Sequence, residues 1–342
     1  MRINHRFSHL FLLICCFQVT IATSASLFVG TNGGGVFTSQ DNGATWTTVN
    51  NGLTRTNITT MVSSDSNLFA GTAGGVFFST NNGKNWNAIN TGLTDTHVLA
   101  LVVSGKNLFV GTYFGGVFLS TNNGENWKEV NDGLDNTIVN TLALSGTTLF
   151  VGTNGGGVFT STNDGTSWKA VNNGLIDKFV YTLAVSGKNL FAGTDEGVFV
   201  SDDNGAHWIS KNNGLANIYY NDPALSDEPM RTNDNVRCIA VHGSSIFIGT
   251  QKGGVFVSHD NGNKWVPANK GLTTMDVYSI AVLGNTLFIG TYGGGVFISN
   301  DNGKCWKKAN NGLTNMRVWS CSIKEELQDS SFQESPKQFA TH

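Results

Sequence analysis

The chain has 342 residues, of which 39% are hydrophobic and 13% are charged, and its formal net charge at neutral pH is −3. A chain of this length can bury a hydrophobic core of its own. Its weak negative charge argues against nucleic-acid binding, which favours basic surfaces. The 42 glycines indicate many tight turns, because glycine tolerates the backbone angles that such turns require.

The first 25 residues have the pattern of a secretory signal peptide. Arg2 and Arg6 precede an apolar run over residues 10–17, and small residues follow it. We expect cleavage after Ala25, or failing that after Ala22, and a secreted, periplasmic or otherwise extracytoplasmic protein. The apolar run is too short for a transmembrane helix, and no other stretch is apolar for long enough to span a bilayer.

One pattern occurs seven times between residues 27 and 306. In its clearest copy, an apolar run ends in Gly152 and Thr153, a Gly-Gly-Val-Phe segment follows, and a Ser-x-Asn-x-Gly-x-x-Trp segment ends at Trp168. The Gly-Thr pairs begin at Gly30, Gly71, Gly111, Gly152, Gly193, Gly249 and Gly290. A period of about 40 residues is typical of repeat architectures such as propellers.

Each copy contains four apolar runs of strand length, which the clearest copy places at 139–144, 149–153, 157–161 and 168–171. The runs are rich in Val, Phe, Leu and Thr and are separated by Gly, Asn and Asp, as expected for strands and turns. The spacing of an amphipathic helix is absent. The sequence therefore predicts an all-β, seven-bladed β-propeller with four-stranded antiparallel blades.

The two ends of the chain predict how the ring closes. The first copy begins directly at its second strand, near Leu27, whereas residues 317–323 follow the last copy and align with the first-strand segment 276–282. Pairing these terminal strands completes one blade and removes an exposed sheet edge. We assign the propeller to residues 26–323. Residues 324–342 lose the period and are rich in polar residues, which predicts a disordered tail.

Seven segments with the pattern Ser-x-Asp/Asn-x-Gly-x-x-Trp resemble Asp-box, or BNR, repeats. They cover residues 39–46, 79–86, 120–127, 161–168, 201–208, 258–265 and 299–306. In each, we expect the Asp or Asn to bond backbone N–H groups two or three residues on, the Gly to adopt a positive φ, and the Trp to be buried. The resemblance implies a propeller similar to those of the sialidase superfamily, photosystem II assembly factors and sortilin-type proteins.

Variation is concentrated where the first strand of each copy begins. The residues before the first-strand valine or its equivalent are Asn57, His97, Ile138, Phe179, Asn235, Asp276 and Arg317. Two residues later come Thr59, Leu99, Asn140, Tyr181, Arg237, Tyr278 and Trp319. We expect both sets to surround the mouth of the ring, opposite the Asp-box turns. They are interpreted either as drift at exposed loop ends or as a ligand site.

One connection, between Leu215 and Val236, is about 15 residues longer than its counterparts. Such a loop is either functional or a tolerated insertion. We expect it to cross the same face as the two variable sets. The candidate ligand-binding residues are therefore Asp276, Arg317, Arg237, Tyr278, Tyr181 and Trp319, together with Tyr219, Tyr220 and Arg231 from the long connection.

Motifs for catalysis are missing: the sequence has no H-E-x-x-H, no paired C-x-x-C and no G-x-S-x-G. We expect no cofactor, no metal, and a non-catalytic exported propeller that binds a protein partner or a glycan at its mouth. The alternative is a glycoside hydrolase, sialidase-like or of another type, that uses carboxylates at the same mouth. The sialidase resemblance implies six blades and an early Arg-Ile-Pro motif, and this sequence has neither.

Overall fold

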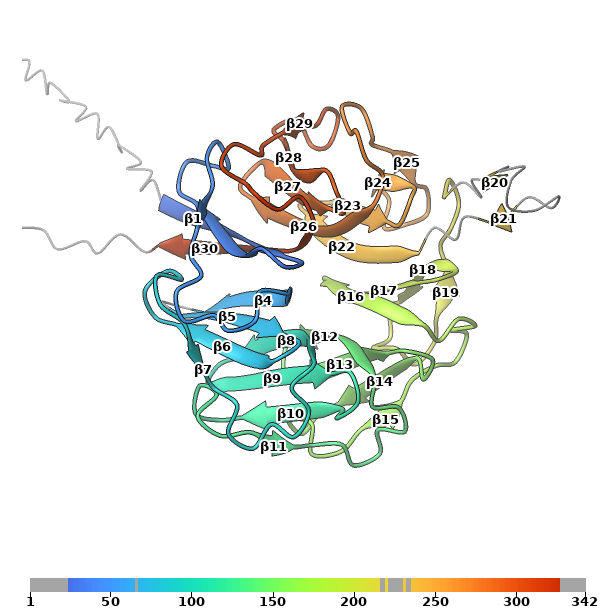
Figure 1. Cartoon of the computed structure of the whole chain (residues 1–342). Helices are drawn as coiled ribbons and strands as arrows, with labels where there is room; N and C mark the ends of the chain where they lie inside the picture. The colour runs from blue at the N-terminus through green and yellow to red at the C-terminus, as the bar shows by residue number, and fades with distance from the viewer. Residues whose placement is uncertain (1–23, 65–66, 216–218, 221–229, 232–234, 327–342) are drawn as a thin grey trace, which may run out of the picture.

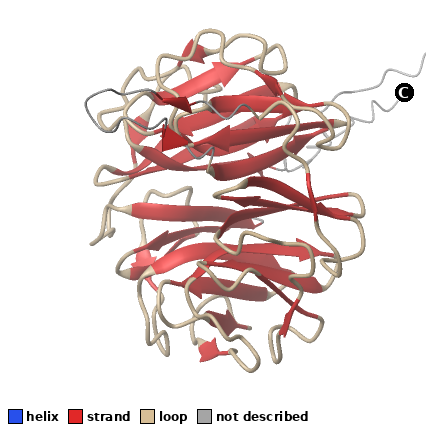
Figure 2. Ribbon diagram, turned by 90° about the vertical axis from the view of Figure 1, so that its right-hand side faces the viewer, coloured by secondary structure: helices blue, strands red, loops and turns tan. Residues whose placement is uncertain are grey.

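The computed structural model describes residues 24–64, 67–215, 219–220, 230–231 and 235–326. All regular elements in these ranges are strands (Figure 2). They form seven four-stranded antiparallel sheets around a ring (Figure 1). Each innermost strand contacts the innermost strand of the next sheet, and β30 contacts both β26 and β4. The predicted seven-bladed propeller is confirmed.

The four strands of each blade follow the sequence order, except in the blade that both termini share. The inner strands are β4 (Ile58–Ser64), β8 (Val98–Ser104), β12 (Val139–Ser145), β16 (Val180–Ser186), β22 (Val236–His242), β26 (Val277–Leu283) and β30 (Val318–Glu326). The second strands are β1 (Ser24–Thr31), β5 (Asn67–Thr72), β9 (Asn107–Thr112), β13 (Thr148–Thr153), β17 (Asn189–Thr194), β23 (Ser245–Thr250) and β27 (Thr286–Thr291).

The third strands are equally regular, and the outer ones are short. The third strands are β2 (Gly35–Ser39), β6 (Gly75–Ser79), β10 (Val117–Ser120), β14 (Val158–Ser161), β18 (Gly197–Ser201), β24 (Gly254–Ser258) and β28 (Gly295–Ser299). The outer strands are β3 (Thr47–Thr48), β7 (Asn87–Ala88), β11 (Lys128–Glu129), β15 (Lys169–Ala170), β19 (Ile209–Ser210), β25 (Val266–Pro267) and β29 (Lys307–Lys308). A separate pair, β20 (Tyr219–Tyr220) and β21 (Met230–Arg231), belongs to the long connection.

The termini close the ring as the sequence predicts. Strands β1 and β30 pair in antiparallel fashion from Ser24 opposite Glu326 to Thr31 opposite Val318, and they lie side by side in Figure 1. The last strand thus extends three residues beyond position 323, where we placed the end of the propeller.

The glycine of each Gly-Thr pair allows neighbouring blades to pack closely. A Cβ atom added at Gly152 would lie 2.5 Å from Cγ1 of Val180, the first residue of the next inner strand. Val180 is fully buried there. Equivalent short approaches recur at the other six Gly-Thr glycines. Any larger residue would push the next blade outward, since a closely packed interior has no room for extra atoms.

The hydrophobic core lies between blades rather than within one of them. In one cluster, Phe109 and Val117 of β9 and β10 pack with Val139 and Leu149 of β12 and β13. Seven such clusters follow the ring. Each blade is therefore stabilised by its neighbours, as in other repeat proteins.

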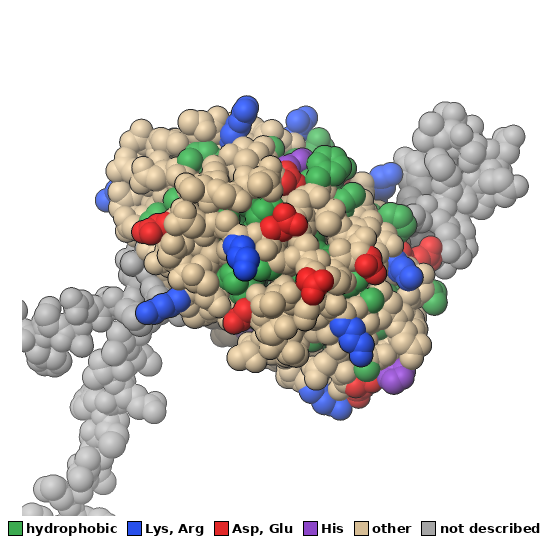
Figure 3. Space-filling view, turned by 90° about the horizontal axis from the view of Figure 1, so that it is seen from below, with side chains coloured by type: hydrophobic (Ala, Val, Ile, Leu, Met, Phe, Trp, Pro, Cys, Tyr) green, Lys and Arg blue, Asp and Glu red, His purple; other side chains and the backbone are tan. Residues whose placement is uncertain are grey.

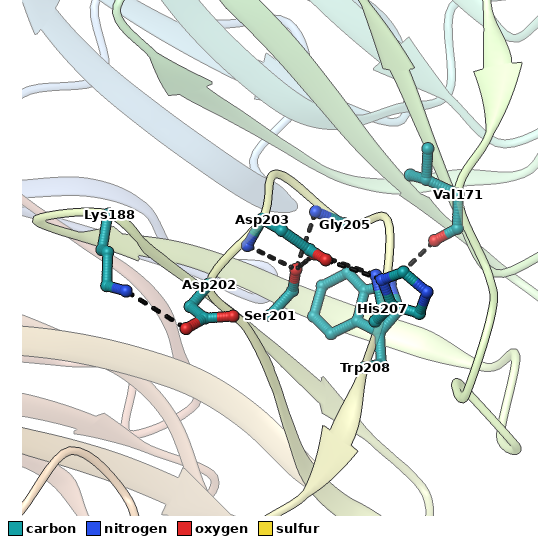
Figure 4. Close-up of polar contacts among 8 residues, drawn as sticks. All are labelled: Val171, Lys188, Ser201, Asp202, Asp203, Gly205, His207 and Trp208. Atoms are coloured by element: carbon teal, nitrogen blue, oxygen red, sulfur yellow. Dashed lines mark hydrogen bonds and ion pairs between the residues drawn. The ribbon is translucent and has the colours of Figure 1, made fainter.

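The turns between third and outer strands are built from their own side chains (Figure 4). In the turn after β18, Ser201 Oγ accepts a bond from Gly205 N at 2.8 Å and donates to Asp203 Oδ1 at 2.8 Å. Asp203 Oδ1 also accepts from His207 N at 2.9 Å, four residues on rather than the expected two or three. Gly205 has the expected positive φ of 87°, and Asn204 before it also has one, of 59°, which the sequence analysis did not anticipate.

The tryptophan that ends each of these turns fastens its blade to the preceding one. Trp208 Nε1 donates to Val171 O at 2.7 Å, and its backbone N donates to Asn173 O at 2.8 Å. The other six tryptophans bond in the same way, so Trp46 links the first blade to Ala309 of the last. We call the face that carries these turns the underside, and the opposite face the mouth face.

We predict that the Trp46 bond contributes measurably to stability. Trp46→Phe keeps most of the buried ring but removes the N–H that bonds Ala309 O, and should cost about 1–3 kcal/mol because the carbonyl loses its partner. Trp46→Ala should cost about 3–5 kcal/mol. Denaturant unfolding measures both, with exposed Thr47→Ala as the control. A Trp46→Phe variant as stable as the wild type would contradict this role.

The turn aspartates also predict acid sensitivity. Hydrogen bonds from Thr45, then Ser39, lower the pKa of Asp41 from 3.8 to about 2. A group with a lowered pKa stabilises the fold above its unfolded value, and the contribution is lost as pH falls through the folded value. Stability should therefore decline between about pH 4 and 2, and Asp41→Asn should weaken that decline.

The chain offers a matched reverse variant for this test. Asn163 occupies the equivalent position and accepts from Ser167 N at 3.0 Å. Asn163→Asp should therefore add acid sensitivity, whereas Asp41→Asn removes some. Thermal melts from pH 7 to 2 compare the two variants with the wild type. Identical pH profiles for all three proteins would show that these carboxylates are not linked to folding.

Candidate functional site

Each inner strand contains a β-bulge near its start. In β26, the pairing with β27 shifts between Val277 and Ser279, so Tyr278 has no partner across the ladder. The same shift recurs at the equivalent residue of the other six blades. A bulge re-aims one side chain. The seven bulge residues all line one central cavity of about 640 Å³: Thr59, Leu99, Asn140, Tyr181, Arg237, Tyr278 and Trp319.

One half of this cavity wall is tied to the neighbouring blades. Thr59 Oγ1 lies 2.6 Å from Val98 O, and Asn140 Nδ2 donates to Val180 O at 3.0 Å. Both acceptors belong to the next inner strand. Leu99, between them in the ring, is apolar and partly buried. The polar groups of this half thus serve the contacts between blades.

The other half combines three aromatic rings with an arginine. The Arg237 guanidinium lies 4.0 Å from the centroid of the Tyr181 ring, and Arg237 Nη2 donates to Gln251 Oε1 at 2.6 Å. Burial, assisted by a hydrogen bond with Asp195, raises the pKa of Tyr181 to about 12. Burial also raises the pKa of Tyr278. Both phenols therefore stay protonated at neutral pH and are poor nucleophiles there.

Unpaired polar atoms gather at this second half. Among the described residues, the buried side-chain atoms without a hydrogen-bond partner are Asp195 Oδ1, Asn235 Oδ1, Arg237 Nε and Trp319 Nε1. Arg237 and Trp319 form part of the wall, whereas Asp195 and Asn235 do not line it. Asp195 lies close enough to raise the pKa of Tyr181, and Asn235 Nδ2 donates to Gln251 Oε1 at 3.4 Å. A buried polar group without a partner costs about 1–3 kcal/mol. Two such side chains in the cavity wall and two more nearby therefore distinguish this half from the other.

The rim around the cavity consists of the residues just before each inner strand. Asp276 Oδ1 accepts from Lys252 N at 2.9 Å, which braces the connection between β23 and β24. Arg317 lies 5.1 Å from the Tyr292 ring centroid and is exposed. Asp177 likewise braces a loop, because Oδ1 accepts from Phe179 N and Oδ2 from Glu196 N. These carboxylates hold backbone in place.

Exposed apolar side chains are concentrated on the mouth face. Of the seven large hydrophobic residues exposed in the described chain, five lie in connections on this face: Phe114, Ile176, Phe179, Met275 and Tyr292. The other two, Ile209 and Val266, lie on outer strands. Figure 3 looks from below Figure 1 onto another side of the ring, where acidic, basic and apolar side chains are interspersed without a large patch of one charge.

The structure brings together six of the nine residues proposed from the sequence. Tyr181, Arg237, Tyr278 and Trp319 line the cavity, while Asp276 and Arg317 stand at its rim. Tyr219 and Tyr220 pair through their backbone with Arg231 and Met230, but their side chains, that of Arg231 and residues 221–229 lie outside the described part.

The sequence analysis missed Asp195 and Gln251 as site residues. Both directly follow a Gly-Thr pair. This position varies as widely as the two variable sets at the start of the inner strands. Its residues are Asn32, Ala73, Tyr113, Asn154, Asp195, Gln251 and Tyr292. That variation was the available signal. It was overlooked because the position belongs to a hairpin connection rather than to an inner strand.

The described residues hold neither a cluster of metal ligands nor a membrane-spanning helix. No group of three or more His, Cys, Asp or Glu side chains in these ranges is arranged to hold a metal ion. Within the same ranges, no helix has the length and apolar character needed to cross a membrane.

Comparisons with known proteins identify the fold. A family model described as the DUF6242 beta propeller domain matches residues 17–141 and again 117–223. No curated protein matches the sequence. The fold is similar to that of a GH74 xyloglucanase from Xanthomonas campestris, with a TM-score of 0.63, 14% identity, and coverage of 89% of this chain and 53% of the enzyme. This chain thus spans about half of the enzyme's length.

Two further solved structures have similar folds. YCF48 bound to D1 peptide gives a TM-score of 0.54 at 14% identity, over 73% of this chain and 81% of YCF48. The WD40 propeller domain of Doa1 gives 0.58 at 15% identity, over 77% and 84%. At these identities the likeness concerns the fold alone.

Proposed function

The chain belongs to the DUF6242 beta-propeller domain family, and we propose that it is a non-catalytic binding protein whose ligand, a protein partner or a glycan, docks at the mouth. The observation that carries this proposal is the contrast between the two faces. On the underside, the seven turns repeat one bonded arrangement. The mouth face has varied bulge residues, unpaired polar atoms and exposed apolar side chains.

Exposed apolar groups around a cavity are a mark of binding surfaces. The cavity volume of about 640 Å³ falls within the roughly 300–1,000 Å³ typical of small-molecule sites. One structure of similar fold carries a bound peptide. This makes a peptide segment of a partner one reasonable ligand, and a glycan chain the other. The underside turns also resemble Asp-box repeats, a resemblance that implies either a binding propeller or a glycosidase and does not by itself decide between them.

We also propose that the protein acts outside the cytoplasm, on the basis of the N-terminal sequence pattern. The backbone pairing of β1 begins at Ser24. Cleavage after Ala22 would leave this strand whole, whereas cleavage after Ala25 would remove its first two residues.

Variants of the mouth face test the binding proposal. Phe114, Phe179 and Tyr292 are 68%, 45% and 38% exposed, so replacing all three by Ser should hardly affect folding. We expect this triple variant to bind its ligand, found by screening glycan and peptide arrays, at least tenfold more weakly than the wild type does.

The matched control changes exposed apolar residues away from the mouth. Ile209→Ser with Val266→Ser alters side chains that are 63% and 48% exposed on outer strands, and this variant should bind as the wild type does. Equal losses in both variants, or no loss in the triple variant, would locate binding elsewhere or show that it is nonspecific.

Glycoside hydrolysis is the second candidate function. One observation favours it: Asp195 places a carboxylate oxygen without a hydrogen-bond partner beside the cavity. An enzyme should release the aryl group from a panel of aryl glycosides and sialosides. Its activity should fall at least 100-fold in Asp195→Asn, because a general acid or base would be lost, and Asp276→Asn tests a second carboxylate at the mouth. An absence of turnover across the panel would rule against this alternative.

A further inference from the structure

The four unpaired atoms around the cavity indicate the chemistry of the ligand. Two are donors, Arg237 Nε and Trp319 Nε1, and two are acceptors, Asp195 Oδ1 and Asn235 Oδ1. A carboxylate or phosphate offers only acceptors and would be repelled by Asp195. An ammonium group offers only donors and would be repelled by Arg237. A hydroxyl group both donates and accepts, so a ligand with several hydroxyls can satisfy both kinds.

The charges at the mouth point the same way. Arg237 and Asp195 both lie close to Tyr181, and Asp276 and Arg317 stand just before the adjacent inner strands β26 and β30. Neither sign dominates, so the site provides little net attraction for a strongly charged group. A neutral ligand suits it better.

The aromatic rings supply the rest of the recognition. Tyr181, Tyr278 and Trp319 all line the cavity. Tyr278 and Trp319 lie on adjacent blades, and one blade separates Tyr278 from Tyr181. Rings of this kind offer a flat apolar surface and a polar edge. A sugar in its six-membered ring form has the complementary combination, since C–H groups cover its faces and hydroxyls surround its edge. A Tyr or Trp side chain of a peptide carries a single polar group at the edge of its ring, whereas a hexose carries several hydroxyls.

We propose, building on the binding function proposed above, that Tyr181, Arg237, Tyr278 and Trp319 form a subsite for one neutral hexose unit at the end of a glycan. We infer an end unit because the seven inner strands surround the cavity on all sides. A glycan chain can therefore enter it only with one of its ends. The four unpaired atoms are closed off from solvent. The proposed contact therefore requires that Arg237 and Trp319 turn these two donors toward the sugar when it binds.

Simple methyl glycosides test this subsite directly. Methyl glucoside, galactoside, mannoside and N-acetylglucosaminide are titrated into the protein by calorimetry, with glucuronate as the anionic probe and glucosamine as the cationic one. We expect at least one neutral methyl glycoside to bind saturably and at least tenfold more tightly than either charged probe. Trp319→Phe and Arg237→Met should each weaken that binding at least tenfold. Lys188→Ala, an exposed underside variant, should leave it unchanged.

Fluorescence provides a second readout. Ligand binding should change the tryptophan emission of the wild type, and that change should be lost in Trp319→Phe, which retains the other seven tryptophans. Thermal melts confirm that each variant is folded, and Trp319→Tyr is used if Trp319→Phe does not fold.

The outcomes separate this inference from the proposed function. Peptide binding that depends on the mouth-face residues, with no binding of any methyl glycoside, would overturn the sugar subsite and leave the binding function standing. Tighter binding of glucuronate or glucosamine, or sugar binding unaffected by both wall variants, would overturn the subsite as well. Failure of every glycan and peptide to bind would remove both proposals.

Discussion

The ring depends on the tryptophan bonds that join each blade to the one before it. Each indole buries an aromatic surface and donates its N–H to a carbonyl of the preceding blade, as Trp208 does to Val171 and Trp46 to Ala309. Every blade repeats this contact on the underside, in addition to the β1–β30 pairing that closes the ring. Among the described residues, the mouth face carries no such indole contact in common to all seven blades, and its residues differ from blade to blade.

The bulges place these variable residues in the wall of the central cavity. A regular inner strand would alternate its side chains between the two blades that flank it, where packing restricts them. The extra residue in each inner strand, such as Tyr278 or Arg237, instead faces the central cavity. Seven copies of one backbone irregularity thus supply seven side chains that can be chosen independently of the core.

The sequence predicted the repeated features well, because each has a local cause. Strand positions, the blade closed by β1 and β30, and the positive φ at Gly205 follow from the pattern of apolar and turn residues. The bulges could not be predicted, since one unpaired residue leaves no mark in hydrophobic spacing. Nor could the Arg237 contact with Tyr181, which joins two blades across the longest connection in the chain.

The two halves of the cavity wall differ in whether their polar side chains have hydrogen-bond partners, and this difference affects how the ring is held closed. Thr59 and Asn140 donate hydrogen bonds to carbonyl groups of the next blade, so the polar side chains of that half already have partners. Arg237 and Trp319 do not, and Trp319 lies on the C-terminal strand that completes the first blade. A ligand that bonds both residues spans from β22 to β30 across β26. Such a ligand would link blades that the Trp46 bond also helps to hold together. Its binding would therefore raise the free energy of unfolding of the ring.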